Sequence, residues 1–420
     1  MSKLIKNRLL GNIVSLIILQ GSNYVFPLLT FPYLVKILET NNYGVLVFCI
    51  AIMQFLNIFV DYGFNISATK EISINKNNLA KVNSIYNLVM TIKLALTVII
   101  GLIYGILIAF LPFFHENMLA FLLSYLVLIG NVLFPIWLYQ GLERMKYITY
   151  INVVVKVIVT ALIFVFIKEK QDINLAVFLQ SLYYFIPGIF SIFFVAKKFK
   201  IKYKLIKDIK KIKNELLKGK FVFMTNLWIN FYSQGPLVII GFISGNIAAG
   251  NYGIGQKIMV AFYGLSQPIV QAIYPYICEM YETHIEKFNL FKKKLMVVST
   301  LFSFFISLML FILSPQVTEF VAGKYTPQLI WLVRIFSIII FISILNTIMA
   351  RIMYAMNLQE ILNRSYSKAA IIFVICAIPL TFWFQEYGMA TIVMVVESII
   401  FSLNIKNMFA FKEAHRAYNV

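Results

Sequence analysis

The sequence predicts an all-α membrane protein of twelve transmembrane helices, arranged as two pseudo-symmetric six-helix lobes around a central cationic cavity. Three observations carry this prediction: 61% of the 420 residues are hydrophobic and only 13% are charged, apolar runs of membrane length recur, and the two halves repeat. About 20 apolar residues cross the hydrocarbon core as a helix. A transmembrane β-barrel would instead show short segments of alternating polarity.

Glycine, proline, asparagine and charge clusters divide the chain into apolar runs. The expected spans are 10–36, 44–64, 82–111, 118–140, 147–167, 174–196, 220–244, 250–277, 294–314, 327–353, 367–385 and 388–409. The first run follows a basic amino terminus, but it is too long for a cleaved signal peptide and shows no small-residue cleavage pattern. It is therefore expected to stay as a span.

The distribution of basic residues predicts the orientation of these spans. Alternating the connections between two sides places 28 of the 37 Lys and Arg residues on the side that holds both termini, and four on the other. Basic residues favour the cytoplasm, so both termini are expected inside. The formal net charge of +20 follows from this topology, and no nucleic-acid partner is expected.

The two halves repeat at an offset of 209 residues. Pro27-Leu28 aligns with Pro236-Leu237, and Asn42-Tyr43-Gly44 aligns with Asn251-Tyr252-Gly253. Both copies begin on the same side, so the repeat is parallel, as in some transporter folds. It predicts an amino-terminal lobe, 1–196, and a carboxy-terminal lobe, 220–420.

A basic cytoplasmic linker, 197–219, joins the predicted lobes. A single helical face carries Leu205, Ile209, Ile212 and Leu216, with lysines around the rest. This pattern predicts an amphipathic helix on the inner leaflet, attracted to anionic lipid headgroups. A purely topogenic linker is the compatible alternative.

Charged residues inside the spans are the main chemical signal. A charge at the membrane centre costs about 2.5–3.5 kcal/mol on insertion scales, so a retained charge faces protein, water or a ligand. The cations expected to line the cavity and bind anionic groups of a passenger are Lys93, Lys156, Lys257 and Arg334. Arg351, near an inner end, is expected to snorkel. Glu397 is the only acidic residue well inside a span.

The first span of each half also collects polar residues and proline. The six expected to form facing cavity walls and to touch sugar are Gln20, Asn23, Tyr24, Asn226, Asn230 and Gln234. Pro27 and Pro236 interrupt the main-chain hydrogen bonds of these helices, so both are expected to be bend points.

The sequence does not indicate disulfides, a metal site or an enzyme active site. The cysteines Cys49, Cys278 and Cys376 are isolated and the three histidines are scattered, which indicates neither a disulfide framework nor a metal site. No acid–base pair, nucleophile triad or phosphate loop has a usable spacing, so an enzyme and a bound cofactor are not expected. No residue decides between proton and sodium as a coupling ion.

Four motifs resemble the Wzx-type polysaccharide flippases of the multidrug/oligosaccharidyl-lipid/polysaccharide exporter superfamily. They are "NYVFPLLTFPYLVKIL" with "NNYG", "DYGFNISATKEIS", "WLYQGLERMKYIT" and "GNYGIGQKI", and the pattern covers essentially the whole chain. The resemblance implies a V-shaped, two-lobed transporter like the multidrug exporters. It would move undecaprenyl-pyrophosphate-linked oligosaccharide, an O-antigen or capsule repeat unit, across the bacterial inner membrane by alternating access.

The resemblance also implies roles and partners. Lys257 matches the family's basic residue entering the eighth span, while Asp61 and Glu143 match acidic residues at inner span ends, with gate roles or structural capping. Implied partners are membrane lipids, a polysaccharide polymerase and a chain-length regulator.

Two other functions stay open. A multidrug antiporter of the same superfamily is expected to carry an acidic residue in its first span, which here has none before Glu39. A membrane-embedded glycan polymerase or glycosyltransferase usually has a sizeable extramembrane loop, and the outward connections here are short.

Overall fold

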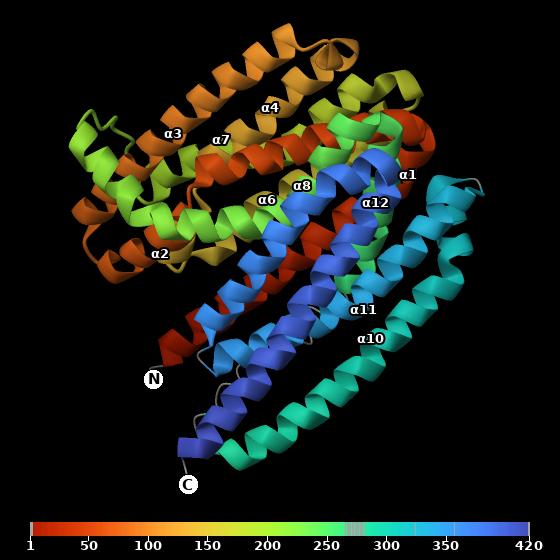
Figure 1. The fold of residues 1–420 in the computed structure, drawn as a ribbon. Helices are drawn as coiled ribbons and strands as arrows, with labels where there is room; N and C mark the ends of the chain where they lie inside the picture. The colour runs from red at the N-terminus through yellow and green to blue at the C-terminus, as the bar shows by residue number, and fades with distance from the viewer. Residues whose placement is uncertain are drawn as a thin grey trace. The chain divides into compact units, whose positions relative to one another are not determined.

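The computed structural model describes residues 3–264, 266, 270, 273, 277, 280–281, 283–323, 325–356 and 358–418, and within them the side chains of 3–20, 23, 24, 145, 148, 221, 225, 229 and 409–418 are not described. The described residues form α-helices and two short 3-10 helices (Figure 1). In chain order these are α1 (Lys3–Asp61), α2 (Phe64–Asn75), α3 (Leu79–Phe110), η1 (Pro112–Asn117), α4 (Met118–Leu133), α5 (Ile136–Gly141), α6 (Met145–Phe166), η2 (Lys170–Asp172), α7 (Ile173–Lys198), α8 (Ile209–Gly264), α10 (Ile285–Ala322), α11 (Pro327–Ala355) and α12 (Gln359–Tyr418).

Nine helical segments of the described chain are long and apolar enough to cross a membrane. Three of them, in α1, α8 and α12, contain one residue with a non-helical backbone: Glu39, Gly245 and Gln385. Each lies at a connection that the sequence predicts between two spans. Divided there, the nine segments give twelve helical runs, and the all-α membrane fold predicted from the sequence is confirmed.

The chain divides into two compact units, Met1–Asn230 and Phe231–Val420. The boundary falls inside α8, so the first residues of that helix fold with the first unit. There the ring of Phe223 stacks on Tyr62, with centroids 4.5 Å apart, and a Cβ on Gly63 would lie 2.7 Å from Val222. The lobes 1–196 and 220–420 describe the sequence repeat and stay a prediction.

Connections predicted on one side of the membrane gather at one end of the first unit. Asn42 donates from its amide to the main-chain oxygen of Lys170, at 2.6 Å, and Glu39 lies 4.0 Å from the Lys170 ammonium. The ring of Phe113, in η1, packs edge-on against Phe48 of α1. The three predicted outer connections of the first half therefore lie together.

The second unit repeats this arrangement with the aligned motif. Asn251, the counterpart of Asn42, donates to the carboxylate of Glu386 at 2.9 Å, next to the reversal of α12 at Gln385. The Tyr387 hydroxyl donates to the main-chain oxygen of Gln328 near the start of α11. In each half of the sequence repeat the asparagine thus holds the connection between the last two predicted spans.

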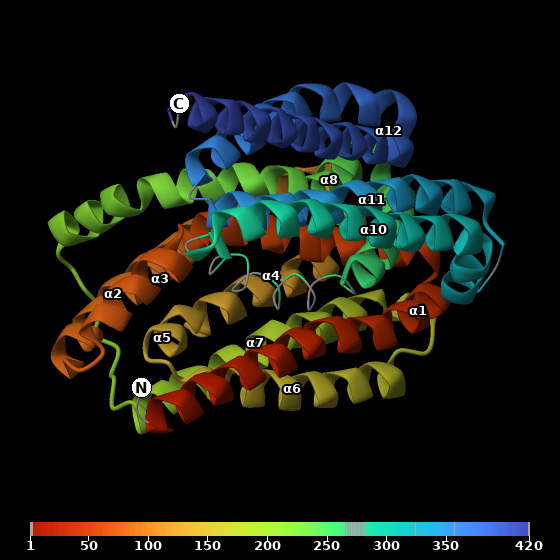
Figure 2. The same cartoon turned by 90° about the horizontal axis from the view of Figure 1, so that it is seen from below.

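Figure 2 shows α10 and α11 running side by side.

Some boundaries differ from the prediction for local reasons. Pro135 separates α5 from α4, because proline lacks the N–H that a continuing helix needs. The linker is helical only from Ile209, and residues 199–208 form an irregular strap.

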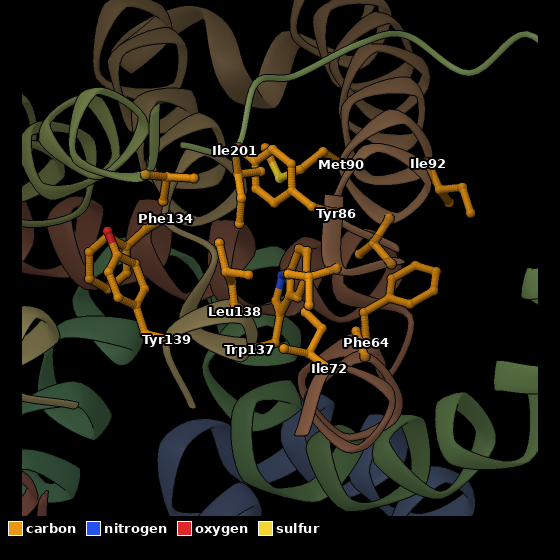
Figure 3. Close-up of a cluster of buried hydrophobic side chains, with 14 residues drawn as sticks. Phe64, Ile72, Tyr86, Met90, Ile92, Phe134, Trp137, Leu138, Tyr139 and Ile201 are labelled. Carbon is orange, nitrogen blue, oxygen red and sulfur yellow. The ribbon is translucent and has the colours of Figure 1, made fainter. Parts of the chain in front are cut away.

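The strap packs on α3 and α5 of the first unit. Its Ile201 is buried in a cluster with Trp137, Tyr86 and Met90 (Figure 3). Main-chain amides of the strap donate to the side chains of Asn87 and Thr91 of α3. Ile212 and Leu216 of the predicted linker face pack on the same cluster, whereas Leu205 and Ile209 are exposed. The linker is thereby docked on protein along part of its apolar side.

Candidate functional site

The structure joins two residues that the sequence assigned to different roles. The ammonium of Lys93 in α3 lies 2.9 Å from a carboxylate oxygen of Asp61, the last residue of α1. Both side chains are largely buried, at 4% and 13% exposure. One turn beyond Lys93, the Thr97 hydroxyl donates to the Lys93 main-chain oxygen within the same helix. Lys93 therefore sits in a compensated, buried ion pair.

Glu143, the second predicted gate or structural acid, lies at the turn between α5 and α6. Its carboxylate is 2.6 Å from the ammonium of Lys76, and both side chains are half exposed. The backbone of Glu143 has a φ of 56°, in the left-handed region that few non-glycine residues adopt. The residue thus lies at a sharp turn with an exposed ion pair.

Lys156 lies on a polar stripe of α6. Its side chain is half buried, between the buried residues Thr149 and Thr160 on the same helix face. The hydroxyl of Thr160 lies 2.8 Å from that of Tyr183 in α7. The interior of the first unit therefore holds hydrogen-bonding groups beside this cation.

Polar residues of α8 form one stripe, as their spacing of four predicts. Asn226, Asn230 and Gln234 are each half buried, and the Asn230 amide donates to the Asn226 main-chain oxygen at 2.8 Å. Gln20, Asn23 and Tyr24, their predicted counterparts, have side chains outside the described set. α1 and α8 continue through Pro27 and Pro236, and their non-helical residues are Glu39 and Gly245 instead.

Lys257 is an exposed cation inside an apolar span. It follows the reversal at Gly245 by twelve residues, about 18 Å along a helix. Buried Ile254 and Ile258 flank it, while the Lys257 side chain itself is exposed. Among the described residues no carboxylate pairs with it.

Arg334 is held by neighbours in the second unit. Its Nε donates to the hydroxyl of Ser314 in α10 at 3.2 Å. The guanidinium lies over the rings of Trp331 and Phe311, at 4.7 and 5.1 Å from their centroids. Cation–π contacts of this kind stabilise a charge against an apolar surface.

Sequence reasoning missed two interior polar pairs. The amide of Asn346 in α11 donates to the carboxylate of Glu397 in α12 at 2.5 Å, and also to its main-chain oxygen. In the first unit the Gln54 amide lies 3.3 Å from the Tyr184 hydroxyl. A lone amide inside an apolar run was the available signal for both, since a buried amide is costly unless it finds a hydrogen-bond partner.

The described side chains offer binding groups and no metal cluster. No group of three His, Cys, Asp or Glu residues that could hold a metal ion occurs among the residues that the structure describes. Amides, hydroxyls and ammonium groups hold anions and sugar hydroxyls by hydrogen bonds. The arrangement thus suits binding of a polar anionic passenger.

Comparison with solved structures shows which fold this is. The lipid II flippase MurJ in an inward closed conformation matches with a TM-score of 0.67 at 14% identity, covering 94% of this chain and 87% of that one. An inward-facing multidrug resistance transporter of the MATE family, from the MOP superfamily, matches with a TM-score of 0.63 at 12% identity, covering 92% and 98%. The chain has the MOP-type fold.

Sequence comparisons reach further than the fold. The chain is 32% identical over 393 residues to the "Putative O-antigen transporter" of Escherichia coli (strain K12), covering 93% of this chain and 94% of that protein. A protein of the same name from Shigella dysenteriae is 28% identical over 406 residues, covering 94% and 98%. Residues 9–281 match the family model described as "Polysaccharide biosynthesis protein". This multi-pass membrane protein therefore belongs to the polysaccharide biosynthesis protein family.

Proposed function

We propose that the protein is a flippase that moves undecaprenyl-pyrophosphate-linked oligosaccharide from the cytoplasmic to the periplasmic leaflet of a bacterial inner membrane. Family membership and relatives named as O-antigen transporters support a role in polysaccharide transport. The fold shared with a lipid II flippase supports a lipid-linked passenger. Transport proceeds by alternating access, with both termini in the cytoplasm and the polyprenyl tail left in lipid.

Lys257 is the observation that carries the proposal. A lysine within an apolar span, with no carboxylate partner among the described residues, carries a charge that is costly in hydrocarbon. An anionic ligand removes that cost, and a pyrophosphate offers several oxygens to a lysine.

The remaining predicted residues divide by their surroundings. We assign Lys156 and the stripe of Asn226, Asn230 and Gln234 to contacts with the glycan and its pyrophosphate. Lys93 and Arg334 have protein partners, so we assign them to holding the helices in place. A polymerase and a chain-length regulator acting on the exported repeat units are partners in the same proposal.

The test replaces Lys257 by Ala and by Arg in a strain that lacks the chromosomal copy. The Ala variant is expected to lower surface polysaccharide roughly tenfold or more, the effect of one lost charge-assisted hydrogen bond, and lipid-linked oligosaccharide accumulates inside. Arg restores part of the activity because it keeps the charge. Lys368→Ala, which removes an exposed lysine of α12, is the matched control. Full export by the Ala variant at equal protein level contradicts the proposal.

A small-molecule antiporter is the second candidate, and Glu397 favours it. A carboxylate inside a span that accepts from Asn346 is a group that cation-coupled transport can use. This function predicts that deletion raises sensitivity to cationic drugs and leaves surface polysaccharide unchanged. The flippase proposal predicts the opposite pair of results.

A further inference from the structure

A groove in the second unit is lined by one stripe of side chains from each of three consecutive segments. α11 contributes Ile344, Ile348 and Arg351, which are spaced by four and three residues on one helix face. α10 contributes a matching stripe that includes Val298 and Phe302, and the segment between α8 and α10 adds aliphatic residues. The space within the groove measures about 130 Å³.

Hydrocarbon is the occupant that suits this lining. Almost every lining atom is carbon, and an apolar cavity of about 150 Å³ stays dry and accepts benzene in an engineered protein. Val298 is 62% exposed, so the groove opens along the outer side of α10. Leu301 and Phe305, also on α10, are each 65% exposed. In a membrane that side faces lipid, and a chain can enter from there.

One end of the groove is cationic. Two contacts set the antiparallel register of α10 and α11: Ser307 donates to the main-chain oxygen of Ser337, and Arg334 donates to Ser314. The same register places Arg351 level with residues 293–297 of α10. The lysine run Lys292, Lys293 and Lys294 therefore lies at the level of Arg351 along α10. Basic pockets between transmembrane helices bind anionic lipid headgroups.

We propose that this groove binds one acyl chain of an anionic phospholipid of the surrounding membrane, with the lipid phosphate at Arg351 and the lysines of α10. An arginine binds phosphate through two parallel hydrogen bonds, so it fixes the headgroup while the chain fills the apolar part. A zwitterionic phospholipid offers the same chain but balances its phosphate with a cation. The site thus selects by headgroup charge, and it does not depend on the transported substrate.

The experiment uses the purified full-length protein in nanodiscs with photoreactive lipids. Phosphatidylglycerol and phosphatidylcholine carry the same diazirine-labelled acyl chain, and labelled peptides are mapped by mass spectrometry. Phosphatidylglycerol is expected to label the stretch around Val298 and Phe302 roughly tenfold more than phosphatidylcholine, as one charge-assisted contact allows. Equal labelling by the two lipids overturns the proposal.

Two matched pairs of variants separate the chain site from the headgroup site. Arg351→Gln is expected to remove the preference for phosphatidylglycerol, and Arg364→Gln, an exposed arginine of α12, leaves it intact. Ser299→Leu adds carbon atoms inside the groove and is expected to lower labelling at least fivefold. Thr300→Leu loses the same kind of hydrogen bond to its own helix, but residue 300 faces outward. This control is expected to leave labelling unchanged.

Two further outcomes keep the test decisive. If Ser299→Leu lowers the thermal unfolding midpoint, Val298→Trp tests the exposed rim, and unchanged labelling in it contradicts the chain site. A long-chain isoprenoid diphosphate added as competitor is expected to leave phosphatidylglycerol labelling unchanged. Complete displacement by this competitor would show that the transported lipid occupies the groove, which overturns a phospholipid site.

Discussion

The two units treat charge inside their helices differently. In the first, Lys93 is neutralised by Asp61 in a buried ion pair. In the second, Lys257 has no carboxylate partner among the described residues, whereas Arg334 is held by a serine hydroxyl and two aromatic rings, and Glu397 accepts from an amide. A neutralised pair holds helices together without attracting a ligand, whereas an uncompensated cation inside a span favours an anion. Anion binding is therefore expected to depend more on the second unit.

The largest loss of stability is expected when the neutralised pair is broken. Asp61→Ala leaves the ammonium of Lys93 buried and unpaired, and breaking a buried pair in this way costs about 3–5 kcal/mol. We expect a large fall in the thermal unfolding midpoint of the purified protein and in its yield. Glu143→Ala, which breaks the half-exposed pair with Lys76, is the control and is expected to cost about 0–1 kcal/mol.

A charge exchange sharpens the assignment of Lys93. Asp61→Lys combined with Lys93→Asp keeps a pair at the same place, so it is expected to recover much of the unfolding midpoint. Export should recover with it if Lys93 only stabilises the fold. Recovered stability without recovered export would instead place Lys93 in contact with the passenger.

A smaller effect compares the two aligned asparagines. Asn251→Ala removes the one described donor to the buried Glu386 carboxylate, and a hydrogen bond to a charged group contributes about 1.5–3 kcal/mol. Asn42→Ala removes a bond to an exposed main-chain oxygen, where about 0.5–1.5 kcal/mol is expected. Unfolding midpoints of the two variants, measured side by side, test this order. Equal losses would mean that Glu386 is hydrated and needs no donor.

The smallest effect concerns the reversals of α1 and α8. Glu39 adopts φ 60° and ψ 172°, a region that glycine occupies readily and other residues rarely. The corresponding reversal in the second half has Gly245. Glu39→Gly is expected to raise stability by about 1 kcal/mol, since relief of strain exceeds the added chain entropy of glycine. A lowered unfolding midpoint would show that the exposed contact of Glu39 with Lys170 matters more than the strain.

Structural features that depend on neighbouring residues were predicted well from the sequence pattern. The twelve helical runs follow from apolar length, and the reversals at Glu39, Gly245 and Gln385 fall at predicted connections. The repeat also anticipated that Asn42 and Asn251 occupy equivalent places, and each holds the last connection of its half of the repeat. These features depend on one helix or on its immediate turn, so local sequence contains their causes.

Partners far apart in sequence were beyond the same reasoning. The sequence predicted Lys93 as a ligand-binding cation and Asp61 as a gate or capping acid. Their separation of 32 residues does not show that two helices bring them together. Asn346 and Glu397, 51 residues apart, show the same limit. The linker face predicted to meet lipid is divided, with Leu216 on protein and Leu205 exposed. The apolar face of a helix shows which side chains are buried, but it does not show whether protein or lipid buries them.

By itself, the sequence determined that this chain is a multi-pass helical membrane protein with a repeated half and cations inside its spans. The bilayer imposes a length and a polarity that any sequence must display. Only the tertiary structure decided which cation is neutralised, as Lys93 is, and which is left exposed, as Lys257 is. The physical reason is that charge compensation depends on distances of a few ångströms between helices, and packing sets those distances.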